Sequence, residues 1–236
     1  MSKVIEFFKK KCNYQLFYEG GNCIYVYPYQ YLQIRRNLEF YSEADYILLD
    51  GMMLTTIFNL FGVSRNRRMS IDFSGIGNEL FSYIVEGNRS VYFIGARHSE
   101  VIQFKNNILN KYPTLNIVGF HHGYLSELPD RGEELVDSIV KLNPDFVFAG
   151  MGSPLQESFL FDLKRKGWKG TGYTCGGFIY QTSLSIDYYP RWVNKFRLRW
   201  LYRGLNEPRA LIKTMYIPWF ILVFVSDYIK YSLRKQ

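Results

Sequence analysis

Residues 146–156 are Phe146-Val147-Phe148-Ala149-Gly150-Met151-Gly152-Ser153-Pro154-Leu155-Gln156, and this stretch predicts a turn from a strand into a helix. The apolar run before Gly150 is typical of a strand buried on both faces, as in a parallel sheet. Ser153, Pro154 and Gln156 predict a capping box, with Ser at the N-cap, Pro at the first helical position and Gln at the third. The segment therefore predicts one strand–helix unit of an α/β fold.

The same kind of unit recurs along the chain. Three more short apolar runs each end at a glycine or a turn: Tyr46–Leu49, Val91–Ile94 and Ile117–Phe120. Between them, residues 99–111 and a segment carrying Leu135, Ile139 and Leu142 have helical spacing. Alternating strands and helices predict a Rossmann-like parallel sheet with flanking helices, whose ligands bind at the carboxyl ends of the strands.

Charge divides the chain of 236 residues into two parts. Residues 1–187 contain 19 Lys and Arg and 19 Asp and Glu, so the whole net charge of +8 falls in residues 188–236. The composition, 47% hydrophobic and 21% charged, excludes a disordered chain. We expect a Rossmann-like body over residues 1–187 and a basic, aromatic, membrane-associating helical appendage over 188–236.

Several classes of protein do not fit this sequence. No stretch reaches the roughly 18 to 20 apolar residues that a spanning helix needs, and the N-terminus lacks a signal-peptide pattern. Three widely spaced cysteines, Cys12, Cys23 and Cys175, support neither a disulfide framework nor a zinc site. We therefore expect a protein of the reducing cytoplasm.

The appendage has a regular pattern of its own. Basic residues recur every four positions from Arg191 to Arg203, and aromatic residues follow the same interval one position later. On one helix these rows would form two adjacent stripes. Residues 214–226 carry no charge and are interrupted by Pro218, a length suited to a bilayer interface or a groove in a partner. The pattern favours a membrane surface, and a helix packed on the body is the structural alternative.

Asp50-Gly51 is the best candidate for catalysis. A carboxylate directly after a buried strand lies at the ligand-binding edge of the sheet and could act as a general base, while Gly51 allows a close ligand. The alternative is that Asp50 caps a helix over residues 52–61.

Two further motifs carry weaker signals. The turn at Gly150-Met151-Gly152 opens a helix whose free N–H groups could bind phosphate, but it matches no standard phosphate loop. Gln156 and Glu157 there have ordinary structural explanations as well. His121-His122 has no ligand-spaced partner, so we expect no metal.

In order, these motifs resemble the WecG/TagA/CpsF glycosyltransferases of bacterial cell-surface polysaccharide synthesis. The resemblance runs from about Ala44 to about Arg209. Its landmarks are Ala44–Gly51, Arg68 with Asp72, Val91–Gly95, Lys111–Pro113, Ile117–Gly119, His121–Tyr124, Pro144-Asp145, Gly150–Pro154, Gln156-Glu157, Pro190–Trp192, Trp200–Arg203 and Glu207–Arg209.

The resemblance implies an inverting, metal-independent transfer, without cofactor, from a UDP-sugar to a polyprenyl-diphosphate-linked sugar. It implies that Asp50 is the base, that the enzyme is peripheral on the inner face of the cell membrane, and that it acts in capsule, O-antigen or teichoic acid synthesis. The resemblance further implies association into a homo-oligomer, and it implies no nucleic-acid partner. The residues it places at the substrates are Gly51, Asp72, Gly95, Gly152, Gln156, Glu157, Arg191, Arg203 and Arg209.

Three departures from the family pattern bear on the donor sugar. The strand end at Ile24–Pro28 lacks the usual Thr or Asn, Gly176–Tyr180 lacks the usual Asp, and Arg199 stands where a Glu is usual. Two other hypotheses stay open at this point. One is a non-catalytic accessory subunit of a membrane glycosyltransferase, and the other is a nucleic-acid-binding protein that uses its basic appendage.

Overall fold

The computed structural model describes residues 3–12, 20–130, 132–195, 198–206 and 208–234. Its strands are β1 (Gly21–Val26), β2 (Tyr46–Leu49), β3 (Ser90–Gly95), β4 (Asn116–His121), β5 (Phe146–Gly150) and β6 (Thr171–Thr174). The helices up to β6 are α1 (Lys3–Lys11), α2 (Pro28–Arg36), α3 (Leu38–Tyr41), α4 (Met52–Leu60), α5 (Gly77–Glu86), α6 (His98–Lys111), the short 3-10 helix η1 (Leu125–Glu127), α7 (Glu133–Leu142) and α8 (Leu155–Arg165). The remaining helices are α9 (Phe178–Leu184), α10 (Arg191–Lys195), α11 (Arg199–Asn206), α12 (Pro208–Met215) and α13 (Ile217–Ser232).

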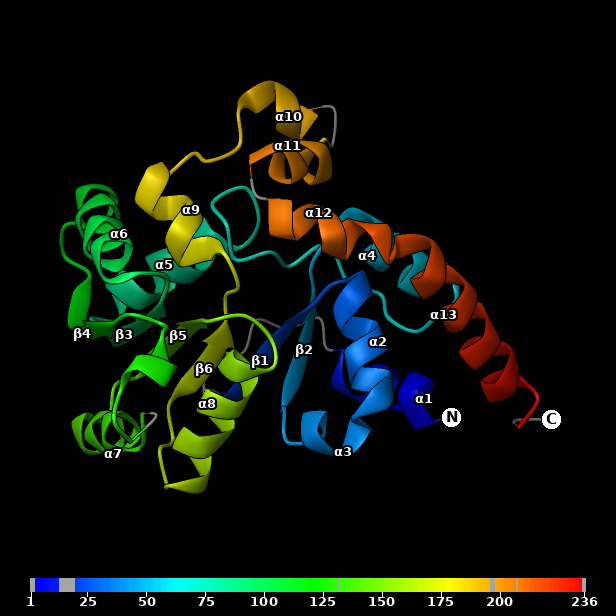
Figure 1. Ribbon diagram of the computed structural model, residues 1–236, viewed down its shortest axis with the longest axis horizontal. Coiled ribbons are helices and arrows are strands. Elements are labelled where there is room, and N and C mark those ends of the chain that lie inside the picture. Colours follow the sequence, from blue (N-terminus) through cyan, green and yellow to red (C-terminus); the bar gives the residue numbers. More distant parts are fainter. Residues whose placement is uncertain (1–2, 13–19, 131, 196–197, 207, 235–236) are drawn as a thin grey trace.

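The six strands form one parallel sheet in the order β2-β1-β6-β5-β3-β4 (Figure 1). This confirms the predicted Rossmann-like α/β class and the four predicted strands. The strands β1 and β6 are two central strands that the apolar-run pattern did not reveal. β6 reads Thr-Gly-Tyr-Thr and is fully buried although only one of its residues is strongly apolar.

Burial on both faces was predicted for all four apolar runs, and for β4 this prediction is wrong. β4 is the edge strand next to β3, and its residues are exposed or half-buried. The composition of Ile117–Phe120 is that of a central strand. The strand lies at the edge of the sheet, however, where its side chains are only partly covered.

Three clusters of buried side chains join the sheet to its helices. Successive residues of a strand point to opposite faces, so Phe93 packs under α5, α6 and α9 whereas its neighbour Tyr92 packs against α7 and α8. At the other end of the sheet, Ile24 and Ile47 pack against α1, α2 and α4. Figure 1 shows helices covering both faces, with the carboxyl ends of β1 and β2 directed toward α12.

The C-terminal segment does not form the single striped helix predicted from the four-residue spacing. The chain forms two short helices, α10 and α11, so the basic residues of the expected stripe are divided between them. Pro218 lies in the first turn of α13, where a missing N–H costs nothing, and it does not interrupt the helix.

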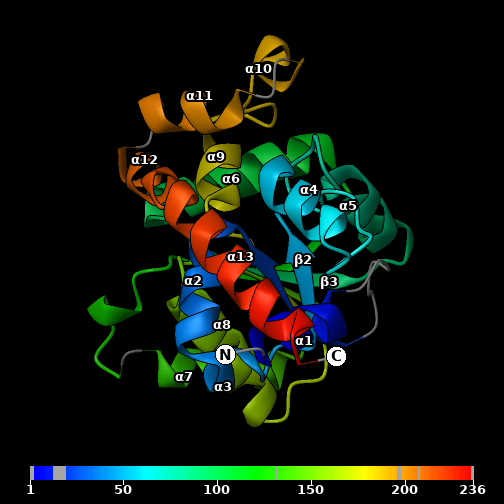
Figure 2. The ribbon, with the colours of Figure 1, turned by 90° about the vertical axis from the view of Figure 1, so that its right-hand side faces the viewer.

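Helix α13 is packed into the body of the protein. Phe220 and Phe224 are fully buried in the cluster with α1 and α2, and Figure 2 shows α13 lying across α2. Asp227 is also fully buried and accepts hydrogen bonds from Arg35 Nε at 2.6 Å and Tyr31 Oη at 3.1 Å. One face of α13 therefore shares a core with the N-terminal helices.

Candidate active site

The direction in which the chain crosses the sheet reverses at its carboxyl edge between β3 and β5. From β3 the chain crosses to β4 on one side, and from β5 it crosses to β6 on the other, which makes this the topological switch point where α/β sheets bind ligands. Gly95 and Gly150 face each other there, and a Cβ atom on Gly95 would lie 2.6 Å from the Gly150 carbonyl oxygen. Gly95 at φ 154° therefore allows an approach of two backbones that no side chain permits.

Asp50 directly follows β2 at this edge. Its N–H donates to the Val26 carbonyl oxygen at 2.8 Å, and its carboxylate is partly open to solvent. Arg68 Nε lies 3.5 Å from Asp50 Oδ1. Gly51, with φ 91°, is the N-cap residue of α4, and no side chain caps that helix. Asp50 is thus directed to the edge of the sheet and does not cap the helix.

Asp72 is the centre of a denser polar cluster. Its Oδ2 lies 2.7 Å from Arg68 Nη2 and 2.9 Å from Arg199 Nη1, and it also accepts from the hydroxyl of Ser70. Its Oδ1 accepts from the N–H of Ser74 at 2.9 Å and from the hydroxyl of the same residue. Burial opposes ionisation of Asp72, but the two arginines and the hydroxyls outweigh it and lower the pKa to about 2.

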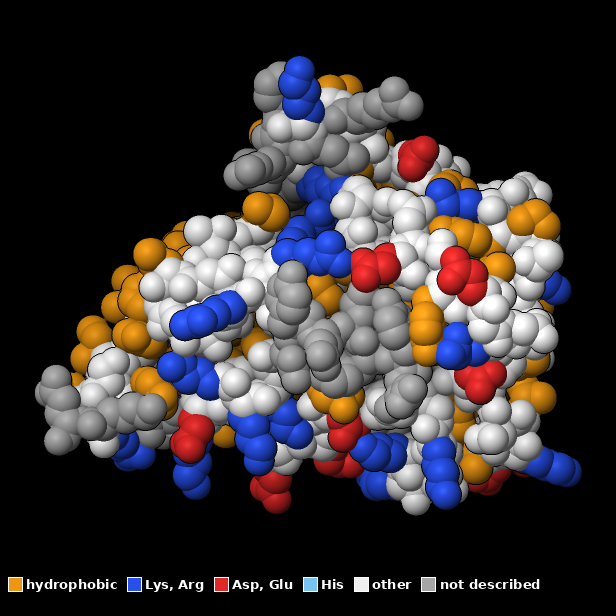
Figure 3. Space-filling model, turned by 180° about the vertical axis from the view of Figure 1, so that it is seen from behind, with side chains coloured by type: hydrophobic (Ala, Val, Ile, Leu, Met, Phe, Trp, Pro, Cys, Tyr) orange, Lys and Arg blue, Asp and Glu red, His pale blue; other side chains and the backbone are white. Residues whose placement is uncertain are grey.

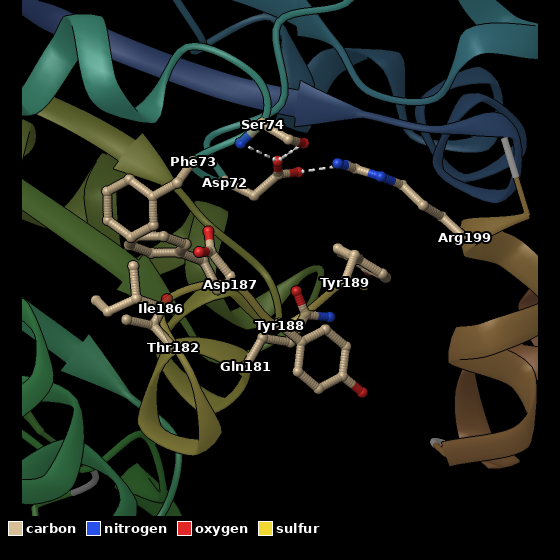
Figure 4. A pocket seen from close by; sticks show the side chains of 11 residues that line it. Asp72, Phe73, Ser74, Gln181, Thr182, Ile186, Asp187, Tyr188, Tyr189 and Arg199 are labelled. Carbon is tan, nitrogen blue, oxygen red and sulfur yellow. Dashed lines mark hydrogen bonds and ion pairs between the residues drawn. The ribbon is translucent and has the colours of Figure 1, made fainter. Parts of the chain in front are cut away.

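Arg199 brings the C-terminal segment to this cluster. Figure 4 shows its side chain reaching from α11 to Asp72 beside the loop that carries Tyr189. The guanidinium carbon lies 4.5 Å from the centre of the Tyr189 ring, a distance typical of a cation–π contact. Arg68 and Arg199 therefore link Asp50, Asp72 and α11 in one chain of alternating charge.

Arg203 lies one turn further along α11, against the loop that follows β6. A Cβ atom on Gly177 would lie 3.1 Å from Arg203 Nη2. The structure therefore places Arg203 beside the loop at the carboxyl end of β6. The side chains of Arg191 and Arg209 lie outside the described part of the chain.

The turn after β5 only partly matches its predicted role. Gly152 has φ 81°, and the space around its Cα is open. The predicted capping box is wrong, because α8 begins at Leu155 after Pro154 and no side chain caps it. The Ser153 hydroxyl instead lies 3.1 Å from Gln33 Oε1 and 3.0 Å from the Tyr41 hydroxyl.

Gln156 and Glu157 form hydrogen bonds that connect the segments at the carboxyl edge. Gln156 Oε1 accepts from the Gly176 N–H at 3.2 Å, which joins the turns after β5 and β6. Glu157 is fully buried and accepts from Gln30 Nε2 at 2.6 Å and from Gln156 Nε2 at 3.1 Å. Burial raises the pKa of the Glu157 carboxyl, against the effect of these hydrogen bonds.

Three residues of this edge were missing from the predicted site. Arg68 appeared only as a landmark of the resemblance, although it contacts both Asp50 and Asp72. Arg199 could have been found from its spacing to Arg203, since residues four apart share a helix face. Tyr27 directly follows β1, whose last residue Val26 pairs with Leu49, the residue before Asp50. It was named only as part of a strand end that departs from the family pattern.

The described residues contain no group of three or more His, Cys, Asp or Glu side chains placed to hold a metal ion. Within the same ranges, every helix is too short or too polar to cross a bilayer.

A parallel six-stranded sheet with Asp50, Asp72 and two arginines clustered at its carboxyl edge defines an α/β protein with a charged site at that edge. The chain belongs to the WecG/TagA/CpsF glycosyltransferase family, described as "Glycosyl transferase WecG/TagA/CpsF family", whose sequence model matches residues 21–234. The enzyme class predicted from the resemblance is therefore confirmed.

Named relatives in this family differ in their donor sugars. The chain is 34% identical over 209 residues to the UDP-Gal:α-D-GlcNAc-diphosphoundecaprenol β-1,4-galactosyltransferase of Shigella boydii, covering 88% of this chain and 86% of that protein. It is 26% identical to an N-acetylglucosaminyldiphosphoundecaprenol N-acetyl-β-D-mannosaminyltransferase of Bacillus spizizenii, covering 76% and 68%. The corresponding Bacillus subtilis enzyme is 24% identical, covering 79% and 70%.

Proposed function

We propose that this protein transfers a galactosyl residue from UDP-galactose to N-acetylglucosamine carried on polyprenyl diphosphate. The galactosyltransferase relative has the higher identity over the greater share of both chains. The strand end at Tyr27 also lacks the Thr or Asn of the family pattern, so the family's common N-acetylmannosamine donor is not carried over to this chain. The observation that carries the catalytic part is Asp50, an open carboxylate at the sheet edge beside Arg68.

In this reaction Asp50 takes the proton from an acceptor hydroxyl as that oxygen attacks the anomeric carbon of the donor. UDP leaves from the opposite face, so an α-linked donor gives a β-linked product with inversion. Negative charge grows on the departing diphosphate, and fixed cations stabilise such charge most where water is scarce. Arg203 is suited to this role, which is why we propose that no metal ion is needed.

We further propose that the enzyme works as a peripheral protein on the inner face of the cell membrane. The outer faces of α12 and α13 expose Met215, Trp219 and Leu222, while the opposite face of α13 is buried in the core. Figure 3 shows hydrophobic side chains gathered along the margin of the molecule at α13. An apolar helix face flanked by basic residues is typical of interfacial membrane binding.

The test is transfer by the full chain to a short-chain lipid-diphosphate N-acetylglucosamine, with the product weighed by mass spectrometry. UDP-galactose is expected to add one hexose, and UDP-N-acetylmannosamine is expected to add nothing. Asp50→Asn should lower the rate of transfer by roughly 10²- to 10⁴-fold, the range for loss of a general base. Near-normal transfer by Asp50→Asn would remove Asp50 from this role.

Product with an N-acetylhexosamine donor alone would overturn the proposed donor. No turnover with any UDP-sugar, together with capture of a partner transferase, would favour the accessory-subunit hypothesis.

A further inference from the structure

Three tyrosines form a continuous path from the active-site edge to the exposed face of the C-terminal helices. The rings of Tyr27 and Tyr29 stack with centroids 6.3 Å apart, and Tyr29 meets Tyr216 edge-on at 5.0 Å. Tyr27 directly follows Val26, whose carbonyl oxygen accepts from the Asp50 N–H, whereas Tyr216 precedes α13 and is exposed. The path therefore leads from the strand end next to the proposed base to the outer surface of the protein.

These rings differ from the core tyrosines nearby. Tyr31 and Tyr41 are at most 2% exposed. By contrast, Tyr27 and Tyr29 are half-buried and Tyr216 is 41% exposed. Pro28 begins α2 between the first two, so that Tyr27 keeps an extended backbone at the strand end. The path is therefore a surface feature of the carboxyl edge.

A cation lies on this path. Lys213 of α12 places its Nζ 5.7 Å from the centre of the Tyr27 ring, and α12 packs against α2. Just beyond Lys213 the protein surface is apolar, because the side chains of Met215 and Trp219 are largely exposed. From the exposed face inward the order is thus apolar surface, aromatic rings with a lysine, and then Arg203 and the carboxylate of Asp50.

We infer that this path is the acceptor subsite, and that it binds a sugar diphosphate carried on a polyprenyl chain. Such an acceptor has an apolar tail, a doubly charged diphosphate and a sugar, in the same order as the surface. The tail meets the face around Met215 and Trp219, Lys213 faces the diphosphate, and the sugar lies on Tyr27 with a hydroxyl toward Asp50. Opposite charges attract across this partly desolvated edge, and aromatic rings pack well against the C–H faces of sugars.

The inference rests on the proposed function for its acceptor class but not for its donor. It can therefore be tested without a donor, by equilibrium binding of a fluorescent prenyl-diphosphate N-acetylglucosamine to the full chain. Lys213→Gln and Tyr29→Leu should each raise the acceptor Kd roughly 5- to 10-fold. Lys213→Arg keeps the charge and Tyr29→Phe keeps the ring, so their acceptor Kd should stay within about twofold of the original. Thermal melts would verify that all variants are folded.

Lys230→Gln on α13 is the matched control, because Lys230 is exposed but far along the helix from Tyr216. It should leave the acceptor Kd unchanged, and the Kd of UDP should be unchanged in every variant. An equal rise of the acceptor Kd in Lys230→Gln would show that Lys213 acts only through general attraction of anions. That result would overturn the subsite. A higher Kd for UDP in place of the acceptor would assign the path to the donor and overturn it as well.

The two proposals can fail separately. Failure of UDP-galactose as a donor would leave these binding constants valid. Wild-type galactosyl transfer combined with unchanged acceptor binding in Tyr29→Leu and Lys213→Gln would leave the proposed function standing without this subsite.

Discussion

Arg199 Nη1 lies 2.9 Å from Asp72 Oδ2, although the two residues are 127 positions apart in the sequence. Both side chains are less than one-fifth exposed. The same carboxylate oxygen contacts Arg68, which also reaches Asp50. The contact thus fixes α11, and with it Arg203, relative to the proposed base.

Arg199→Gln should loosen this connection. A hydrogen bond between charged groups at a partly buried site is worth about 1.5–3 kcal/mol, so kcat/KM should fall by roughly 10- to 100-fold. Hydrogen exchange in α11 should become faster at the same time. Arg67→Gln is the matched control, because Arg67 forms an exposed pair with Glu79 and should change neither quantity. Normal exchange in α11 of the Arg199 variant would show that the contact does not hold the helix.

Asp72 should contribute to stability in a pH-dependent way. Its pKa is lowered to about 2 in the folded protein from an ordinary 3.8, so the folded state favours the ionised form. The contribution, on the order of 2 kcal/mol, is present above pH 4 and is lost as the pH falls toward 2. In urea unfolding, Asp72→Asn should therefore be less stable than the original at pH 7, and the difference should shrink on acidification. Asp162→Asn, at an exposed pair, serves as the control.

Glu157→Gln should show the opposite sign. Because burial raises the pKa of Glu157, the folded protein disfavours its ionised form. This cost appears as the pH rises above the ordinary carboxyl pKa, and it is absent in the amide. The stability of Glu157→Gln relative to the original should therefore improve from pH 4 to pH 8. A difference independent of pH would mean that the hydrogen bond from Gln30 fully offsets the burial.

Two substitutions on α13 should separate its core role from its surface role. Phe224→Ala removes a fully buried ring and should lower the free energy of unfolding by about 3–5 kcal/mol. Leu222→Ala, two residues away and 65% exposed, should change it by less than about 0.5 kcal/mol. Flotation with anionic vesicles should reverse the order, with Leu222→Ala weakened and any folded Phe224→Ala unaffected. Equal flotation of all three proteins would remove α13 from the membrane-binding surface.

The sequence by itself determined the α/β class, because buried strands and the glycine turns that follow them give a recognisable pattern over a few consecutive residues. It also placed Asp50, Gly95 and Gly152 at the carboxyl edge, since each directly follows or ends an apolar run. β6 was not predicted because Thr171–Thr174 do not form an apolar run, although helices over the sheet bury all four residues.

Only the tertiary structure decided the partners of the C-terminal segment. Spacing predicted that Arg199 would belong to a basic stripe, but the chain breaks into α10 and α11 and directs this side chain to Asp72. Glu157 followed a glycine turn and was expected at the substrate, but it is buried against Gln30. The local pattern of residues predicts which face of a helix or strand is apolar. It does not predict which distant charged side chain will contact that element, because such a contact depends on the packing of the whole chain around the sheet.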